Sequence, residues 1–303
     1  MHTPSWFSDG KVLVVNAKTC GINKDGKEQY LVNPETGIRS GSEIDDSLAE
    51  CCDLIVKGDF NRDEIFYHDY ADVVNRDAYV PKYFDHKTFT GIEALVESHK
   101  ELKLMSLGEL VENESILVFG GHGSPSSDQR LGTVPYIKVS DLRAGHVNIN
   151  PTNMVPLDLA KKFWRGNDSG LMPYDLISPE RASKNIGEFC VLMPGQEQAI
   201  FTKEVIVVRA NDINLLDQFY LLWALSLNEV RAQWERIVFM QTNREDVGKR
   251  MLEIKIPIPA NIKEANKFSA PFKQYYNSLE ESRNTFIKAL SDSEFNHHIH
   301  LGE

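Results

Sequence analysis

The chain has 303 residues, of which 42% are hydrophobic and 25% charged, a balance typical of a globular protein with a sizeable core. Its formal net charge of −11 argues against a general nucleic-acid coat protein, which usually presents a basic surface. The sequence contains neither an apolar run long enough to span a membrane nor the pattern of a signal peptide, so we expect a cytoplasmic protein.

The negative charge is concentrated at the front of the chain. Residues 1–105 hold 12 basic and 19 acidic residues, whereas residues 106–262 hold 16 and 19. In the middle region the basic residues come in local groups, so that region is able to carry a basic face. We therefore separate an acidic N-terminal segment, 1–105, from a middle region, 106–262, and a C-terminal segment, 263–303.

The front of the chain predicts short strands and two helices. Residues 11–16 predict a strand, and the turn at Asp25–Gly26 predicts a hairpin from it into a second strand at 30–33. Turn formers dominate 33–46 and predict a loop. Helices are expected at 45–56, with Asp45 or Asp46 as the cap, and at 90–100.

The middle region predicts short helices and strands around a glycine- and serine-rich loop, "GGHGSPSSDQRLG". The stretch "GTVPYIKVSDLRAGHVNIN", residues 132–150, predicts a strand, a turn that ends at Gly145, and the start of another strand. The other expected elements are a helix at 106–112, a strand at 115–120, a helix at 156–165, several short strands over 174–210, a buried and an amphipathic helix over 214–238, and a closing strand at 251–259.

The last element is a long helix over 263–292. Phe272, Leu279 and Phe286 repeat every seven residues, and a second line holds Phe268, Tyr275, Ser282 and Ala289. Such a stripe fits a helix packed on its own domain and, equally, a spacer that pairs with another helix. On the second interpretation, the pairing residues are Phe268, Phe272, Tyr275, Leu279 and Phe286, and a homodimer is an option.

The sequence motifs of common enzyme classes are absent. The chain has no GxSxG, no GK[ST] after its glycine-rich loop, no HExxH and no [NDS]PP[YFW] loop of the kind that adenine methyltransferases need. The four cysteines form no CxxC pair, and the histidines at 297–300 fit a solvated tail. We expect no catalytic residue and no metal site in this chain.

The region from about 106 to 290 resembles the target recognition domain of type I restriction–modification specificity subunits, which also occurs at the C-terminus of fused N6-adenine DNA methyltransferases. Four segments carry the resemblance in order: "SLGELVE", "GTVPYIKVSDLRAGHVN", "YDLISPERASKNIGEFCVLMPG" and "LLWALSLNEVRAQWERIVFMQTNREDVGKRMLEIKIPIP". Residues 6–46 resemble the tail that follows the catalytic domain of N6-adenine methylases. A full specificity subunit has two recognition domains and two spacer helices, and this chain offers one of each.

The resemblance implies a mixed α+β fold, with a curved sheet, flanking helices and a long spacer helix. It implies sequence-specific recognition of double-stranded DNA without catalysis. A DNA methyltransferase subunit or domain, with or without a restriction subunit, is then the partner, and it binds S-adenosylmethionine; this chain needs no cofactor. On this interpretation the acidic residues 1–105 face protein, because like charge repels phosphate.

The loops of such a domain supply donors and acceptors to base edges in the major groove. The base-reading candidates are His122, Ser124, Ser126, Gln129, Arg130, Asp141, Arg143, Arg181, Lys184 and Asn185. The phosphate-contact candidates are Lys161, Lys162, Arg165, Arg244, Lys249 and Arg250.

These assignments have simpler alternatives. Asp141 fits a turn cap better than a contact to cytosine, and His146 fits a turn or packing residue. For each basic residue the alternative is a solvated surface charge. For the whole chain the alternative is a protein-interaction or dimerisation module that does not bind DNA, which the net charge favours.

Overall fold

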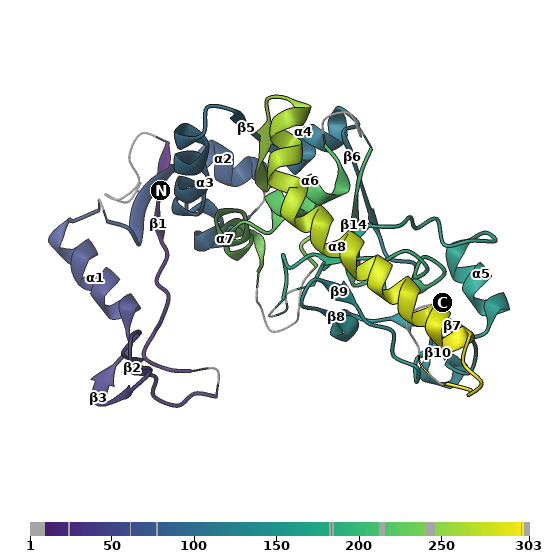
Figure 1. Cartoon of the computed structure of the whole chain (residues 1–303). Helices are drawn as coiled ribbons and strands as arrows, with labels where there is room; N and C mark the ends of the chain where they lie inside the picture. The colour runs from purple at the N-terminus through teal and green to yellow at the C-terminus, as the bar shows by residue number, and fades with distance from the viewer. Residues whose placement is uncertain are drawn as a thin grey trace. The chain divides into compact units, whose positions relative to one another are not determined.

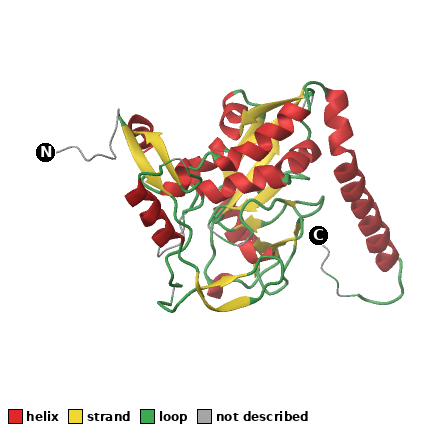
Figure 2. Ribbon diagram, turned by 90° about the vertical axis from the view of Figure 1, so that its left-hand side faces the viewer, coloured by secondary structure: helices red, strands yellow, loops and turns green. Residues whose placement is uncertain are grey.

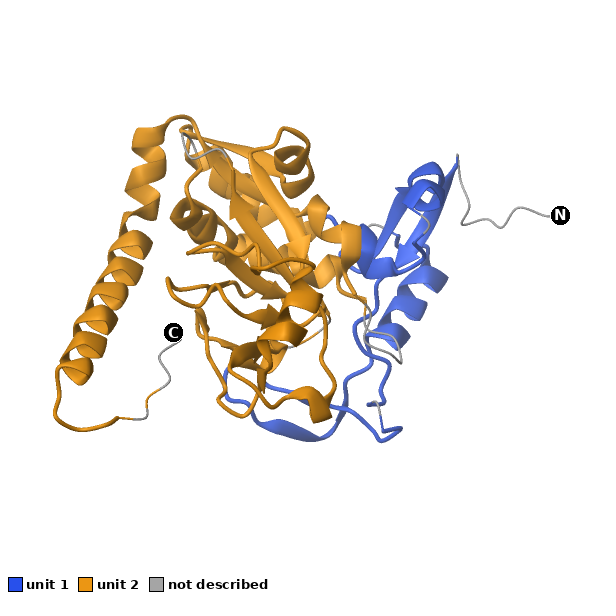
Figure 3. Cartoon of the chain, turned by 90° about the vertical axis from the view of Figure 1, so that its right-hand side faces the viewer, with its two compact units in different colours: residues 1–86 blue, residues 87–303 orange. Residues whose placement is uncertain are grey.

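The computed structural model describes residues 10–23, 25–60, 62–76, 78–181, 183, 185–211, 216–239, 246–297 and 299. The chain divides into two compact units, Met1–His86 (unit 1) and Lys87–Glu303 (unit 2), shown in blue and orange in Figure 3. Helices and strands occur in both units (Figure 2), and a long helix forms the C-terminal element. The expected mixed α+β fold with a long C-terminal helix is confirmed.

Unit 1 is built from two small antiparallel pairs of strands and two helices. Strand β1 pairs with β4, and β2 pairs with β3. Its elements are β1 (Lys11–Val15), β2 (Tyr30–Val32), β3 (Arg39–Ile44), α1 (Ser47–Lys57), β4 (Ile65–Asp69), α2 (Tyr70–Arg76) and the 3-10 helix η1 (Pro81–Phe84).

Two predictions for unit 1 are wrong and one is confirmed. The predicted hairpin from 11–16 into 30–33 does not form, because β1 takes its partner from residues 65–69. The turn formers of 33–46 do not prevent a strand, since β3 lies within them. Helix α1 begins where its cap predicts: the side chain of Asp46 accepts a hydrogen bond of 3.0 Å from the backbone N–H of Ala49.

Unit 2 follows the predicted order of elements closely. Its helices are α3 (Lys87–Ser98), α4 (Leu107–Glu112), α5 (Leu157–Trp164), α6 (Gln218–Leu225), α7 (Asn228–Ile237) and α8 (Ile262–Ser291), with 3-10 helices η2 (Ser127–Gln129), η3 (Val139–Asp141) and η4 (Gly248–Glu253). Its strands are β5 (Leu102–Ser106), β6 (Ile116–Gly120), β7 (Val134–Ile137), β8 (Leu142–Arg143), β9 (His146–Val147), β10 (Met154–Val155), β11 (Leu176–Pro179), β12 (Cys190–Val191), β13 (Ile200–Phe201), β14 (Val205–Ala210) and β15 (Lys255–Pro259).

The largest sheet in the described part of unit 2 has the strand order β6-β14-β11-β12-β9-β8. Its neighbours pair antiparallel except β12 and β9, which are parallel. Apolar side chains from these strands and from β7 and β13 form one core cluster that includes Ile137, Leu142, Ile177, Phe201 and Val207. Because Phe119 of β6 and Ile137 of β7 pack in or against this core, it fixes the ends of the strands from which the next loops begin.

A second sheet, with the order β10-β7-β13, lies beneath helix α5. Its core cluster contains Val134, Tyr136, Val155, Ala160 and Ile200, with Leu159, Phe163 and Trp164 packed against it. The indole N–H of Trp164 donates to the carbonyl of Ala199 at 3.1 Å and ties α5 to the strand below. The sheet and the helix therefore form one rigid support.

Helix α8 packs on its own unit along its first two thirds. In Figure 1, α8 runs past α6. The ring of Phe268 stacks on Trp223 of α6 with 4.4 Å between centroids, and Tyr276 is buried. Arg283 donates to the carbonyl of Pro194 at 3.0 Å. The interpretation of a helix packed on its own domain is confirmed for this part. At one position of the predicted seam the inward side chain is the next one along, because Tyr276 is buried and Tyr275 is 53% exposed.

The other predicted pairing residues divide between the inner and outer sides of α8. Phe272 and Leu279 are half-buried, and Phe286 is 45% exposed. Pairing of the exposed side with another helix stays a prediction.

Candidate nucleic-acid interface

The loop between β6 and β7, residues 121–132, is held against the fold by its glycines. A Cβ atom on Gly121 would lie 2.0 Å from the carbonyl oxygen of Thr202, and one on Gly132 would lie 2.0 Å from the carbonyl carbon of Val155. Gly123 lies against the ring of Phe163 in α5. Only glycine permits these approaches, so the loop is seated on the β10-β7-β13 sheet and on α5.

His122 is part of this support. Its Nδ1 accepts the backbone N–H of Phe201 at 3.1 Å, so its Nε2 carries the proton that is donated to the carbonyl of Ser169 at 2.9 Å. Burial lowers the pKa of His122 below its ordinary value, with a smaller opposing effect from the Ser169 carbonyl. Both ring nitrogens are used inside the fold, which removes His122 from the base-reading set.

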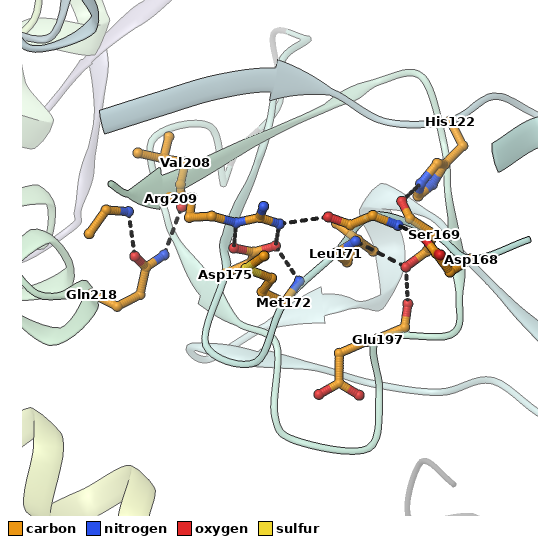
Figure 4. Close-up of polar contacts among 12 residues, drawn as sticks. His122, Asp168, Ser169, Leu171, Met172, Asp175, Glu197, Val208, Arg209 and Gln218 are labelled. Atoms are coloured by element: carbon orange, nitrogen blue, oxygen red, sulfur yellow. Dashed lines mark hydrogen bonds and ion pairs between the residues drawn. The ribbon is translucent and has the colours of Figure 1, made fainter. Parts of the chain in front are cut away.

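The segment that receives His122 is itself fixed by an ion pair. Arg209 of β14 donates to both carboxylate oxygens of Asp175, at 2.7 and 2.6 Å, and to the carbonyl of Gly170 at 2.8 Å (Figure 4). The Ser169 hydroxyl donates to the carbonyl of Glu197 at 2.6 Å. Asp175 is 1% exposed, so this pair is buried structure. No local pattern in the sequence marks it, because its partners are 34 residues apart.

The outer part of the loop presents polar side chains. Ser124, Ser126 and Gln129 are exposed, and the Ser124 hydroxyl shares a hydrogen bond of 3.1 Å with Thr202. The Ser126 N–H donates to the Gln129 side chain at 3.3 Å, which closes the short helix η2. These groups offer both donors and acceptors to solvent from a backbone that is fixed at its two ends.

Arg130 is anchored within the same loop. Its guanidinium lies 5.1 Å from the centroid of the Tyr136 ring and donates to the carbonyl of Pro125 at 3.2 Å. The geometry favours a role in holding the loop, with the side chain still half-buried at the surface.

Helix α5 places cations beside this loop. Lys162 and Arg165 are exposed, and Lys161 is half-buried. Arg165 ends the helix in a left-handed conformation, with φ 57°. Phe163 and the segment before α5 lie against Gly123 and Gly132, so the helix that carries these cations packs on the polar loop. We call residues 121–132 together with α5 the loop–helix surface.

The turn between β8 and β9 is the second predicted reading site. The Asp141 carboxylate accepts the backbone N–H of Lys138 at 2.8 Å, so the cap interpretation is confirmed. Arg143 is exposed and donates to the carbonyl of Leu142 at 2.9 Å. His146 shares a hydrogen bond of 2.9 Å with the hydroxyl of Tyr275, and burial lowers its pKa. Of these three residues, which lie at the end of η3, in β8 and in β9, Arg143 is the exposed one.

In the third predicted site, the described side chains of Arg181 and Asn185 are bound to other parts of the fold. Arg181 pairs with Asp246 at 2.6 Å and Glu204 at 2.8 Å, so its charge is neutralised within the fold. Asn185 donates to the carbonyl of Leu142 at 3.3 Å. Lys184 lies outside the described residues. Because these ion pairs and this hydrogen bond occupy Arg181 and Asn185, both side chains are less available to contact DNA bases.

The basic loop before β15 is partly described. Arg250 lies 4.0 Å from the centroid of the Phe239 ring and donates to the carbonyl of Ile237 at 3.1 Å. Lys249 is exposed, and Arg244 lies outside the described residues. Among the described residues of this segment, Lys249 therefore remains a phosphate candidate, and the candidacy of Arg244 stays a prediction.

Among the residues that the structure describes, no group of three or more His, Cys, Asp or Glu side chains is placed to hold a metal ion. No helix there has the length and apolar character required to cross a membrane.

No protein-family model matches the chain, and no curated protein matches it. Among solved structures it is similar to a chain from the type I R-M system, at 18% identity and a TM-score of 0.39, with 79% of this chain and 53% of that one covered. It is also similar to the HsdS subunit of Thermoanaerobacter tengcongensis, at 17% identity, a TM-score of 0.37 and coverage of 74% and 50%.

A third similar structure is the type IIG restriction endonuclease BpuSI, at 10% identity, a TM-score of 0.45 and coverage of 75% and 33%. The chain thus spans about half the length of the first two structures it matches. The resemblance noted in the sequence is confirmed as a low-identity structural similarity to type I specificity subunits and a type IIG enzyme.

Proposed function

We propose that this chain recognises a DNA sequence and directs a separate N6-adenine methyltransferase part to it, without catalysing a reaction itself. The observation that carries the proposal is the loop–helix surface. There, a polar loop held at both ends lies beside the exposed cations Lys162 and Arg165. Phosphate contacts of such cations position a protein on DNA, while polar loops read the bases.

The division of labour in the proposal has three parts. Residues 106–262 contain the recognition region, residues 263–303 supply the spacer helix and tail, and the acidic residues 1–105 face the protein partner. The methyltransferase partner binds S-adenosylmethionine and extrudes the adenine. A cytoplasmic location, where DNA and such an enzyme meet, belongs to the same proposal.

A titration with salt tests the proposal. The full chain is mixed with fluorescently labelled duplexes of random sequence, and the association constant is measured by anisotropy at increasing salt. Replacing Lys162 and Arg165 together by Gln removes two phosphate contacts, so the slope of log K against log salt falls by about 1.8. The control is Lys11→Gln with Lys57→Gln, which removes two exposed cations from unit 1 and leaves the slope unchanged.

The rival function is a protein-interaction module, and one observation favours it. Unit 1 exposes large apolar side chains on and beside the β2–β3 pair, among them Val32, Ile38 and Ile44, and an isolated pair of strands is only marginally stable in water. Binding of a methyltransferase partner together with no binding of any duplex, at low or high salt, supports this rival and contradicts DNA recognition.

A further inference from the structure

Leu131 is an apolar side chain at the outer edge of the polar loop. It is 82% exposed, and its chain neighbours are Arg130 and Gly132. A single exposed leucine needs no explanation on most surfaces. What distinguishes Leu131 is that the backbone on both sides of it is fixed.

Contacts on either side hold Leu131 in its outward position. On one side, Arg130 is bound over the Tyr136 ring and to the carbonyl of Pro125. On the other, Gly132 lies against the backbone of Val155, and the Thr133 N–H donates to the Val155 carbonyl at 3.1 Å. Both flanking residues thus contact the β10-β7-β13 sheet, and between them the Leu131 side chain is exposed.

The neighbours of Leu131 in sequence define the kind of surface that it would meet. Ser126, Ser127 and Gln129 are exposed donors and acceptors in the same short loop. The major groove of DNA displays both donors and acceptors, together with one apolar feature, the C5-methyl group of thymine. Polar side chains gain little from that methyl group, whereas an exposed leucine buries it.

We propose that Leu131 is a specificity-determining residue that contacts the C5-methyl group of one thymine in the recognised sequence. The inference rests on the proposed function and identifies one base of the recognised sequence as thymine. An alternative role, a wedge inserted between base pairs from the minor groove, would act on base stacking and would not depend on a methyl group.

Selection from a randomised duplex pool tests the inference with the full chain. Wild type, Leu131→Ala and the control Leu48→Ala, a leucine that is 43% exposed on α1, each select their preferred sequences. We expect the wild type and Leu48→Ala to share a motif in which one thymine is lost by Leu131→Ala, with all other positions kept.

Deoxyuridine, which lacks the methyl group, is then placed at that thymine. Wild-type affinity should fall about fourfold, the effect of one buried methyl group, and the affinity of Leu131→Ala should stay unchanged. A shared motif that Leu131→Ala keeps in full overturns the inference and leaves DNA recognition intact. Equal weakening on every sequence, insensitive to deoxyuridine, indicates a wedge and also overturns it. Absence of any selected motif for the wild type contradicts the proposed function itself.

Discussion

The hydroxyl of Tyr276 in α8 donates a 2.9 Å hydrogen bond to the carbonyl of Gly145, 131 residues earlier in the chain. Gly145 lies in the turn between β8 and β9 with φ 78°, and a Cβ atom there would come within 2.7 Å of the same hydroxyl. The glycine therefore meets two demands, a left-handed backbone and the close approach of a tyrosine. Through this contact the long helix fixes the turn that carries Arg143.

Replacement of Tyr276 by Phe removes only this hydrogen bond. The Gly145 carbonyl keeps the backbone N–H of Val191 at 2.9 Å but loses the hydroxyl, so we expect the free energy of unfolding to fall by about 1 kcal/mol. Tyr275→Phe serves as the control, because the Tyr275 side chain is 53% exposed and water can replace its hydroxyl at His146. Chemical denaturation of both variants measures the difference, and equal losses would contradict the assignment.

Breaking the ion pair between Asp175 and Arg209 should lower the free energy of unfolding by a larger amount. Its side chains are 1% and 14% exposed, so Asp175→Asn leaves a buried guanidinium without its counter-charge. We expect a loss of about 3 kcal/mol in the free energy of unfolding. Asp59→Asn breaks the exposed pair with Arg62 and should cost less than about 1 kcal/mol. Urea titration compares the two variants.

Protonation of His122 makes the stability dependent on pH. Burial holds its pKa in the folded state below the ordinary value of 6.5, so the unfolded chain takes up the proton first as the pH falls. The contribution of neutral His122 to the free energy of unfolding is fully present above about pH 6.5. It is lost on acidification, and the free energy of unfolding then falls by up to about 1.4 kcal/mol per pH unit. His122→Gln does not titrate. Denaturation at neutral pH and at about pH 5 should show a weaker pH dependence for this variant than for the wild type.

The wild type and His122→Gln share the contribution of His146, whose pKa burial also lowers. Parallel pH dependence of the two proteins would therefore show that His122 is not the buried titrating group that the geometry indicates.

The sequence predicted best those elements whose signals are local. Asp46 caps α1, and Ser106 with Glu109 forms the capping box of α4, each within one turn of its helix. The pairing of β1 with β4 was missed because it joins segments about 50 residues apart, and the turn at Asp25–Gly26 suggested a nearer partner.

The candidate site shows the same division between local and distant signals. Residue types and turns were enough to predict the cap at Asp141 and an exposed Arg143. They did not show that Arg181 pairs with Glu204 and Asp246, or that His122 uses both ring nitrogens, because those partners are 23 to 79 residues away in sequence. Hydrogen bonds and ion pairs to residues distant in sequence thus occupy polar side chains that the sequence alone leaves available for binding DNA.

Arg143 and Lys249 are exposed, and the proposal gives them different roles. A base-reading arginine contributes about 1–3 kcal/mol of discrimination at one base pair. Arg143→Ala should therefore relax the preference at one position of the selected motif and leave the others unchanged. Lys249→Ala should weaken binding to all sequences alike and lower the salt slope by about 1, since a phosphate contact carries no sequence information. Competition binding with single-substitution duplexes separates the two patterns, and uniform weakening by Arg143→Ala would reassign that residue to the backbone.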